Sequence, residues 1–186
     1  MKLIYCITGS FCNHKNALDA LRTLSQGNEI TPAISEIAAM QDTRFGKASE
    51  LIENVTEICG RKYISSICEA ESTVTPMKAD ALIISPCTGN TLAKIANGIT
   101  DTVITMCVKC QLRNRLPVII ALATNDGLSA NLFNIAMTLE KKNVYFVPFG
   151  QDNAIGKPSS LICDFSRINE TLVSALDKKQ LQPILI

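Results

Sequence analysis

The sequence predicts an α/β fold with a parallel sheet that carries helices on both faces. Two observations lead to this prediction. Short runs rich in Ile, Val and Ala alternate with segments of helical period. The short runs are almost continuously hydrophobic, as expected of strands that are buried on both faces. With 186 residues, of which 47% are hydrophobic, the chain is long enough for one well-buried core, so we predict a single domain over residues 1–186.

The order of the predicted elements is β-α repeated, with short loops. The predicted strands are Leu3–Thr8, Ile30–Ser35, Ala81–Ser85, Val118–Ala123 and Val144–Val147, with a weaker one at Lys62–Ser66. The predicted helices are Asn13–Gln26, Arg44–Cys59, Thr91–Asn97, Thr102–Asn114, Ser129–Lys142 and Phe165–Asp177. Capping residues support several of the boundaries, with Gly60 and Gly98 fitting helix ends. The short patch Gly156–Ser160 is interpreted as a surface loop.

Composition and charge argue against several classes of partner. The formal net charge is +1, from 18 basic and 17 acidic side chains spread along the chain, so no basic stripe indicates a nucleic-acid partner. No apolar run approaches the roughly 20 residues needed to cross a bilayer, so no membrane partner is expected. The start, Met1–Ile7, fits a buried strand and not an export signal. We therefore expect a cytoplasmic protein.

The eight cysteines are expected to be reduced thiols, because no export signal is predicted. Cys107 and Cys110 have the Cys-x-x-Cys spacing of redox or zinc sites. No second pair with zinc-finger spacing exists, and the single histidine, His14, lies far upstream. No metal site is expected, and two ordinary helix thiols are the favoured interpretation.

The chemistry is expected in the loops that leave the carboxyl ends of the strands, where ligands bind in an open parallel sheet. The first of these loops contains Gly9, Ser10 and Phe11. It offers a glycine for close backbone approach, a hydroxyl, and free helix N–H groups that suit a phosphate. The Gly-x-Gly-x-x-Gly dinucleotide spacing is absent, and a plain turn capped by Ser10 or Asn13 is the alternative.

The loop after the strand at Ala81–Ser85 carries the strongest local signal. Thr88, Gly89, Asn90 and Thr91 are small or polar residues that open a predicted helix. Their side-chain donors, next to free backbone amides, suit a phosphate or the edge of a flavin ring. The alternative is an elaborate helix cap without a ligand.

Four further candidate ligand-binding residues lie outside these two loops. Ser35 ends the second predicted strand and offers a hydroxyl. Arg44 opens the following predicted helix, where its guanidinium group suits a carboxylate or is simply solvated. Asn125 follows the fourth predicted strand, although its Asn-Asp-Gly context also suits a tight turn. Arg113, in a basic cluster at a predicted helix end, favours the helix dipole whether or not a substrate approaches.

Three segments resemble the flavin-binding cysteine decarboxylase superfamily. They are Thr8-Gly-Ser10, Ala121-x-Ala-x-Asn125 and Pro86-x-Thr-x-Asn-Thr-Leu-Ala-Lys-Ile-Ala-Asn-Gly-Ile-x-Asp101. Over essentially the whole chain, the resemblance narrows to a sporulation branch of this superfamily. The residues that carry the closer resemblance are Asp42-Thr-Arg-Phe-Gly46, Tyr145-Phe-Val-Pro-Phe-Gly-Gln-Asp152 and Lys179-Gln-Leu-Gln-Pro183.

This resemblance implies a three-layer, Rossmann-like fold of the flavodoxin type, homo-oligomers, and bound flavin mononucleotide (FMN). The implied FMN-binding residues are Gly9, Ser10, Phe11, Ser35, Thr88, Gly89, Asn90 and Thr91. The resemblance also implies a separate partner subunit that binds NAD(P). Together the two proteins are expected to oxidise dihydrodipicolinate to dipicolinate in the mother cell of a sporulating bacterium. Arg44, Arg113 and Asn125 are the candidates for binding this small dicarboxylate.

Two departures from the superfamily pattern limit what is carried over. The decarboxylases have a catalytic histidine between the second and third loops, whereas Arg61–Asp80 contains none, which disfavours decarboxylation. Their Pro-Ala-Met-Asn motif is altered, with Leu122 and Thr124 beside Asn125. No residue is assigned as catalytic. A rival hypothesis is a non-catalytic subunit that kept the flavoprotein fold as a scaffold and activates its partner.

Overall fold

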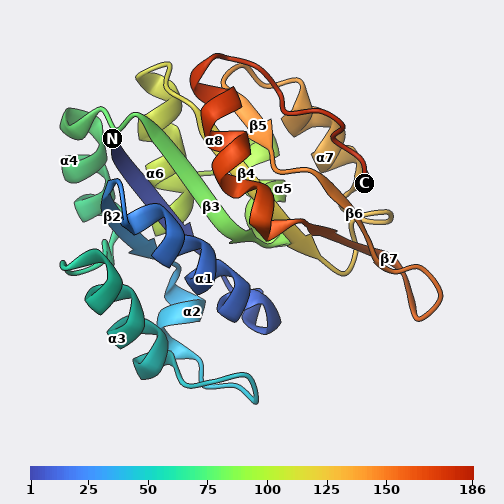
Figure 1. The fold of residues 1–186 in the computed structure, drawn as a ribbon, viewed down its shortest axis with the longest axis horizontal. Helices are drawn as coiled ribbons and strands as arrows, with labels where there is room; N and C mark the ends of the chain where they lie inside the picture. Colours follow the sequence, from blue (N-terminus) through green and yellow to red (C-terminus); the bar gives the residue numbers. More distant parts are fainter.

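The computed structural model describes residues 1–186 and contains a seven-stranded sheet at its centre (Figure 1). The strands are β1 (Lys2–Ile7), β2 (Glu29–Ile34), β3 (Ala81–Cys87), β4 (Val118–Thr124), β5 (Val144–Phe146), β6 (Phe149–Asn153) and β7 (Lys157–Cys163). The first five pair in parallel in the order β2-β1-β3-β4-β5. This is the strand order of flavodoxin-like folds, in which ligands bind at the switch point between β1 and β3.

Helices cover both faces of the sheet, as the sequence predicts (Figure 1). On one face lie α1 (His14–Ser25) and α8 (Ile168–Leu176), with α3 (Ala48–Cys59) packed on α1. On the other lie α5 (Gly89–Asn97), α6 (Val103–Arg113) and α7 (Leu132–Leu139), with α4 (Ile67–Met77) packed on α6. Short elements complete the chain: α2 (Glu36–Met40) and the 3₁₀ turns η1 (Phe11–Asn13) and η2 (Phe165–Arg167). No helix is long and apolar enough to span a bilayer.

The continuous hydrophobicity of the strands follows from this layering. Every residue of β3 is buried, and β1 is buried everywhere except at its first residue. Burial on both faces excludes the alternation of apolar and polar residues that a half-exposed strand shows. The strands and the inner helix faces form one core cluster, so the α/β class predicted from the sequence is confirmed.

The main difference from the predicted fold is an antiparallel hairpin. Strands β6 and β7 pair with each other, and β7 pairs antiparallel with the end of β4 through Ala123 and Thr124. The hairpin projects from the body at the lower right of Figure 1. Its first half is polar and exposed, so it lacks the apolar run by which the parallel strands are recognised. The predicted loop Gly156–Ser160 is therefore wrong beyond its turn, because Lys157 begins a strand.

Two helices are not predicted by the sequence patterns. In α4, β-branched residues and Pro76 lower helix propensity, but Ala70 and Val74 lie four residues apart and are both buried. The weak strand predicted at Lys62–Ser66 is wrong, since only Ile64 forms a bridge, with Ala33. The second such helix is α2, which is only five residues long and gives too short a pattern to recognise.

Candidate functional site

A cleft of about 830 Å³ opens where β1, β3 and β4 end, and the β6–β7 hairpin forms its far side. This volume is within the range of cofactor sites. The cleft lies at the β1/β3 switch point that the strand order defines. It is lined by Gly9, Ser10, Phe11, Cys12, Asn13, Phe45, Thr88, Gly89, Asn90, Ala123, Thr124, Asn125, Asp126, Asp152, Lys157, Pro158, Ser159, Ser160, Leu161 and Ile162.

Thr8 joins the first and third strand ends at the base of the cleft. Its hydroxyl donates to the carbonyl oxygen of Pro86 at 2.6 Å and accepts from the amide of Thr88 at 3.1 Å. The side chain is almost completely buried. Because both bonds cross between loops that are about 80 residues apart in the chain, Thr8 fixes the position of the Gly9 turn relative to the start of α5.

The start of α5 presents free donors to the cleft. The Thr88 hydroxyl accepts from the amide of Thr91 at 3.2 Å, so Thr88 is the N-cap residue, and the same hydroxyl also donates to the Thr91 hydroxyl. These two side chains therefore cap the helix. The amides of Gly89 and Asn90 are the first two of the helix and have no intrahelical acceptor, so they are available to an anionic group.

Gly89 is held in a space that no side chain can share. A Cβ atom at this position would lie less than 3.0 Å from side-chain atoms of Thr124, Asp126 and Asn131. These three side chains are linked, since Asp126 Oδ1 accepts from the Thr124 hydroxyl and from Asn131 Nδ2. The loop after β4 therefore packs directly on the backbone of the loop after β3.

Ser35 provides a buried hydroxyl without a partner. Its side chain is 7% exposed, and its Oγ makes no hydrogen bond within the chain, although Ser35 is the N-cap residue of α2. The adjoining Gly9 is also constrained, because a Cβ there would lie 3.0 Å from Ile37 of α2. A buried polar atom without a partner is unusual in a folded protein and is commonly satisfied by a ligand or ordered water.

Ser10 and Phe11 line the same side of the cleft. The Ser10 hydroxyl accepts from Asn13 Nδ2 at 3.0 Å. The ring of Phe11 packs against that of His14, with 5.3 Å between the ring centroids. Asn90 is exposed at the entrance, with a side chain that is free to contact a ligand.

The charged side chains of the cleft are few. Asp126 and Asp152 are acidic, and Lys157 is the one cation that lines it. Lys157 Nζ lies 2.9 Å from Asp152 Oδ2, and this ion pair raises the pKa of Lys157. The cleft thus holds one more carboxylate than cation, so an anionic ligand depends on backbone and hydroxyl donors.

The three candidates for carboxylate binding lie in different places. Asn125 lines the cleft and is exposed. Arg44 lies at the rim, with its guanidinium carbon 4.8 Å from the centroid of the Phe45 ring, and Phe45 lines the cleft. Arg113 ends α6, shortly before β4 begins, and therefore lies at the opposite edge of the sheet. The structure does not bring Arg113 to the cleft.

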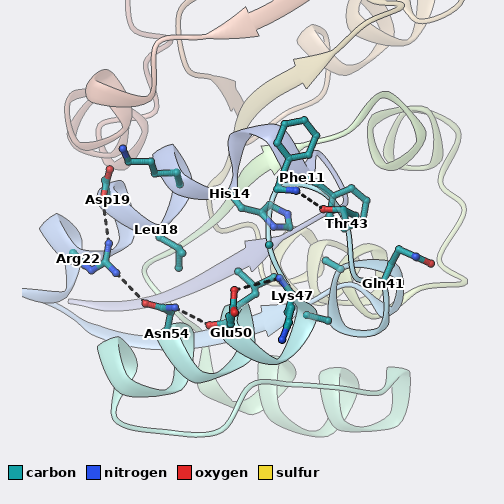
Figure 2. A pocket seen from close by; sticks show the side chains of 16 residues that line it. Phe11, His14, Leu18, Asp19, Arg22, Gln41, Thr43, Lys47, Glu50 and Asn54 are labelled. Atoms are coloured by element: carbon teal, nitrogen blue, oxygen red, sulfur yellow. Dashed lines mark hydrogen bonds and ion pairs between the residues drawn. The ribbon is translucent and has the colours of Figure 1, made fainter.

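His14 lines a second cavity of about 250 Å³ between α1 and α3 (Figure 2). Its Nε2 lies 2.8 Å from the carbonyl oxygen of Thr8, so the ring supports the Gly9 turn. Burial lowers the pKa of His14, and the Thr8 carbonyl opposes this effect. Phe11 and Phe45 border both cavities. His14 therefore contributes to the position of the first loop without lining the cleft.

Several residues of the site are not identified by sequence reasoning. Thr8 could have been found, because it directly precedes Gly9 at the end of a buried strand. Asp126 carries only a turn signal in the sequence. The hairpin residues Asp152 and Lys157 have no local signal, because their place beside the cleft depends on the antiparallel pairing of β7 with β4.

The two cysteines with redox-like spacing lie away from the cleft. Cys107 and Cys110 are buried in α6, and no cysteine of the chain forms a disulfide. Burial raises the pKa of the Cys6 thiol in β1, and the neighbouring Cys107 raises it further. No group of three or more His, Cys, Asp or Glu side chains has the arrangement of metal ligands.

The strand order and the switch-point cleft define a flavodoxin-like α/β protein, and comparisons with known proteins identify the family. The flavoprotein family profile matches residues 1–178. The B subunit of dipicolinate synthase from Bacillus subtilis (strain 168) is 34% identical over 181 residues, which cover 97% of this chain and 90% of that protein. The chain therefore belongs to the flavoprotein family and, within it, to the family of dipicolinate synthase B subunits.

Solved structures agree with this assignment. The crystal structure of the dipicolinate synthase B subunit from Bacillus halodurans C superposes with a TM-score of 0.91 at 36% identity, covering 100% of this chain and 95% of that chain. The FMN-dependent cysteine decarboxylase SpaF has a TM-score of 0.70 at 21% identity, covering 94% of this chain and 97% of that chain. At this lower identity the likeness shows a shared fold.

Proposed function

We propose that the chain binds FMN in the cleft and is one of two subunits that oxidise dihydrodipicolinate to dipicolinate. Its partner in this proposal is the A subunit of dipicolinate synthase, which binds NAD(P) as the second cofactor. The reaction removes two electrons and two protons from the dihydropyridine ring, and the nicotinamide accepts a hydride. The proposed setting is the cytoplasm of the mother cell during sporulation.

The observation that carries the proposal is a set of uncharged donors at the β1/β3 switch point. The Gly89 and Asn90 amides and the close-packed Gly9 turn lie where flavodoxin-like folds bind phosphate, and the Ser35 hydroxyl without a partner follows the neighbouring strand β2. These residues fit FMN because they can bind a phosphate dianion through hydrogen bonds alone, in a cleft that has no unpaired cation. FMN would supply two-electron redox chemistry when bound.

Each residue of the chain has a distinct part in this proposal. Thr8 fixes the two phosphate-facing loops relative to each other, and Gly89 allows the loop after β4 to pack against the start of α5. Phe11 and Phe45 provide aromatic faces at the side of the cleft where a flavin ring can stack. Ser10, Thr88, Asn90 and Thr91 complete the proposed FMN site.

The dicarboxylate substrate is expected at the rim. An inner position would bring its two carboxylates close to Asp126 and Asp152, which repel them. Arg44 at the rim offers a bidentate partner, and Asn125 offers an uncharged donor. Arg113 is left out of the proposal because it lies at the other edge of the sheet.

The proposal is tested by titrating the purified chain with FMN and following flavin fluorescence, with and without the partner subunit. We expect saturable quenching, and turnover of dihydrodipicolinate only when NAD(P) and both proteins are present. The Asn90→Ala variant should weaken FMN binding and leave the fold intact, because the side chain is exposed and leaves no core cavity. Unchanged FMN affinity in this variant would contradict the proposed site.

A non-catalytic scaffold is the second candidate, and the charge of the cleft favours it. The excess of acidic side chains over cations is unfavourable for a dianionic substrate. A chain that binds only phosphate, or no ligand, and still activates the partner subunit would fit this pattern. A colourless chain that does not quench FMN but raises the activity of the partner subunit would establish this alternative.

Exposed apolar side chains support the further proposal of a homo-oligomer. Leu132 and Phe133 at the start of α7 are 52% and 72% exposed, and Leu128 precedes them on the same segment. Exposed apolar clusters of this kind are typical of subunit interfaces. Sedimentation velocity of the chain and of Phe133→Asp would test the proposal, with dissociation expected for the variant.

A further inference from the structure

The two carboxylate oxygens of Asp126 differ in their hydrogen bonds within the chain. Oδ1 accepts from the Thr124 hydroxyl and from Asn131 Nδ2, the latter at 2.9 Å. Oδ2 accepts no hydrogen bond within the chain, and Asp126 lines the cleft. The orientation of the carboxylate is therefore fixed, with Oδ1 bound by the protein and Oδ2 available to a ligand.

The surrounding network makes this orientation rigid. The Asp126 carbonyl oxygen accepts from the amides of Ser129 and Asn131, each at 3.1 Å. Asn131 is buried, and its Oδ1 accepts from Asn134 Nδ2 at 2.9 Å, so its own amide group is fixed. Gly89 packs against the same oxygen of Asp126. The Asp126 side chain has no space in which to turn without breaking these bonds.

No cation of the cleft neutralises Asp126. Lys157, the only basic side chain in the lining, pairs with Asp152 on the hairpin. A partly buried carboxylate is stabilised by donors, and a bound ligand that covers the cleft removes the water that would otherwise provide them. The group that lies against Oδ2 must therefore be a hydrogen-bond donor, which excludes a phosphate or a carboxylate at this point.

We propose that Asp126 Oδ2 accepts a hydrogen bond from an N–H group of the heterocycle that binds in the cleft. This inference rests on the proposed function, in which the imide N–H of the bound flavin is such a group. Asp126 is then a residue that contacts the ligand and selects its donor edge. It fixes which edge of the ring points toward the start of α7.

Asp126→Asn is the informative variant, because it changes one atom. The asparagine keeps its oxygen on the two donors, Thr124 and Asn131, so its NH₂ group replaces Oδ2. The cleft then presents a donor where the wild type presents an acceptor. Binding of a ring N–H should become roughly 10- to 100-fold weaker, since a hydrogen bond to a charged group is replaced by two opposed donors.

The control is Asp152→Asn, which removes the same charge from the same cleft but leaves the Asp126 network intact. We expect its FMN affinity to change by less than about threefold, because the Lys157 pair is exposed to solvent. Far-UV circular dichroism and urea unfolding establish that both variants are folded.

The experiment compares FMN with 3-methyl-FMN, which lacks the imide N–H, in fluorescence titrations of the wild type and both variants. If the flavin is the donor, the wild type should prefer FMN roughly 10- to 100-fold and Asp126→Asn should lose this preference. Equal binding of FMN and 3-methyl-FMN by the wild type, or normal FMN affinity of a folded Asp126→Asn, would overturn the inference.

The proposed function fails in a different way. A wild-type chain that binds neither flavin contradicts the FMN proposal and this inference with it, whereas equal binding of both flavins contradicts this inference alone. The comparison of two ligands on the wild type also needs no variant, so it remains decisive if Asp126→Asn does not fold.

Discussion

The two sides of the cleft are built in opposite ways. On the side of the parallel sheet, Thr8, Gly89 and Asp126 lie on three different loops and are linked by short, largely buried hydrogen bonds and close packing. On the hairpin side, Asp152 and Lys157 form an ion pair that stays exposed to solvent. A change on the first side disturbs several loops at once, whereas a change on the second disturbs a solvated surface.

This contrast assigns different tasks to the two sides. Fixed geometry is needed where backbone amides bind a charged group, because a hydrogen bond weakens steeply with small displacements. The outer part of the hairpin, residues 151–158, is exposed and can vary without affecting the core, to which only its base contributes, through Phe149, Leu161 and Cys163. We expect mutational effects on stability and ligand affinity to be large on the sheet side and small on the hairpin side.

The largest effect is expected for Gly89→Ala. Its Cβ would lie less than 3.0 Å from side-chain atoms of Thr124, Asp126 and Asn131, which hold each other in place. Overpacking of this kind costs about 1–3 kcal/mol of unfolding free energy. FMN titration should detect no binding, and urea unfolding should show the loss. Gly27→Ala is the matched control, since no atom lies within 4 Å of its Cβ; an equally stable Gly89→Ala would contradict the tight packing.

The second-largest effect is expected for Thr8→Val. The two side chains have nearly the same shape, but valine leaves the Thr88 amide and the Pro86 carbonyl oxygen without their bonds to the hydroxyl. A buried group that loses its partner costs about 1–3 kcal/mol. We expect an unfolding free energy lower by about 2 kcal/mol and a roughly tenfold weaker FMN affinity. Thr23→Val, at an exposed hydroxyl of α1, should change neither quantity.

The same contrast explains what could be predicted from the sequence. The parallel strands and the loops after β1 and β3 are recognisable because buried strands are continuously apolar and their loops begin with Gly or Thr. The hairpin is not, because Gln151, Asp152 and Asn153 are exposed and gain their position only from pairing with β7. The place of Arg113 away from the cleft could not be predicted for a related reason: a helix end looks alike in sequence at either edge of the sheet.

The partnership of Asp126 with Thr124 and Asn131 could not be predicted either. The three residues follow β4 within one short segment, where Asn, Asp and Gly also indicate an ordinary turn. Their function as a packing surface for Gly89 depends on the distance between the β3 and β4 loops, which no local pattern encodes.

A smaller effect is expected from His14, and it depends on pH. Burial lowers the pKa of His14 in the folded chain, so the folded state binds fewer protons than the unfolded state near the ordinary value of about 6.5. The unfolding free energy should therefore decrease as the pH falls through about 6.5. Urea unfolding at several pH values should show this slope in the wild type. In His14→Gln it should be absent, and a slope that persists would assign it to other groups.

Acidic groups do not obscure the His14 test. Glu29 and Asp101 also have shifted pKa values, lowered by Arg61 and Lys94 respectively. Stability from such carboxylates is lost only as the pH falls below their ordinary values of about 4. The two pH windows are therefore separate, and the interval between about pH 7.5 and 5.5 reports on His14.

The smallest effect is expected for Lys157→Gln on the hairpin. The variant breaks the pair with Asp152, but both side chains are in contact with solvent, so water replaces the lost interaction. Urea unfolding should show no measurable change. FMN affinity should also stay within about threefold, because the proposed phosphate donors all lie on the sheet side. A large loss of FMN affinity, with the fold intact, would mean that the hairpin contributes a phosphate ligand and that the division between the two sides is wrong.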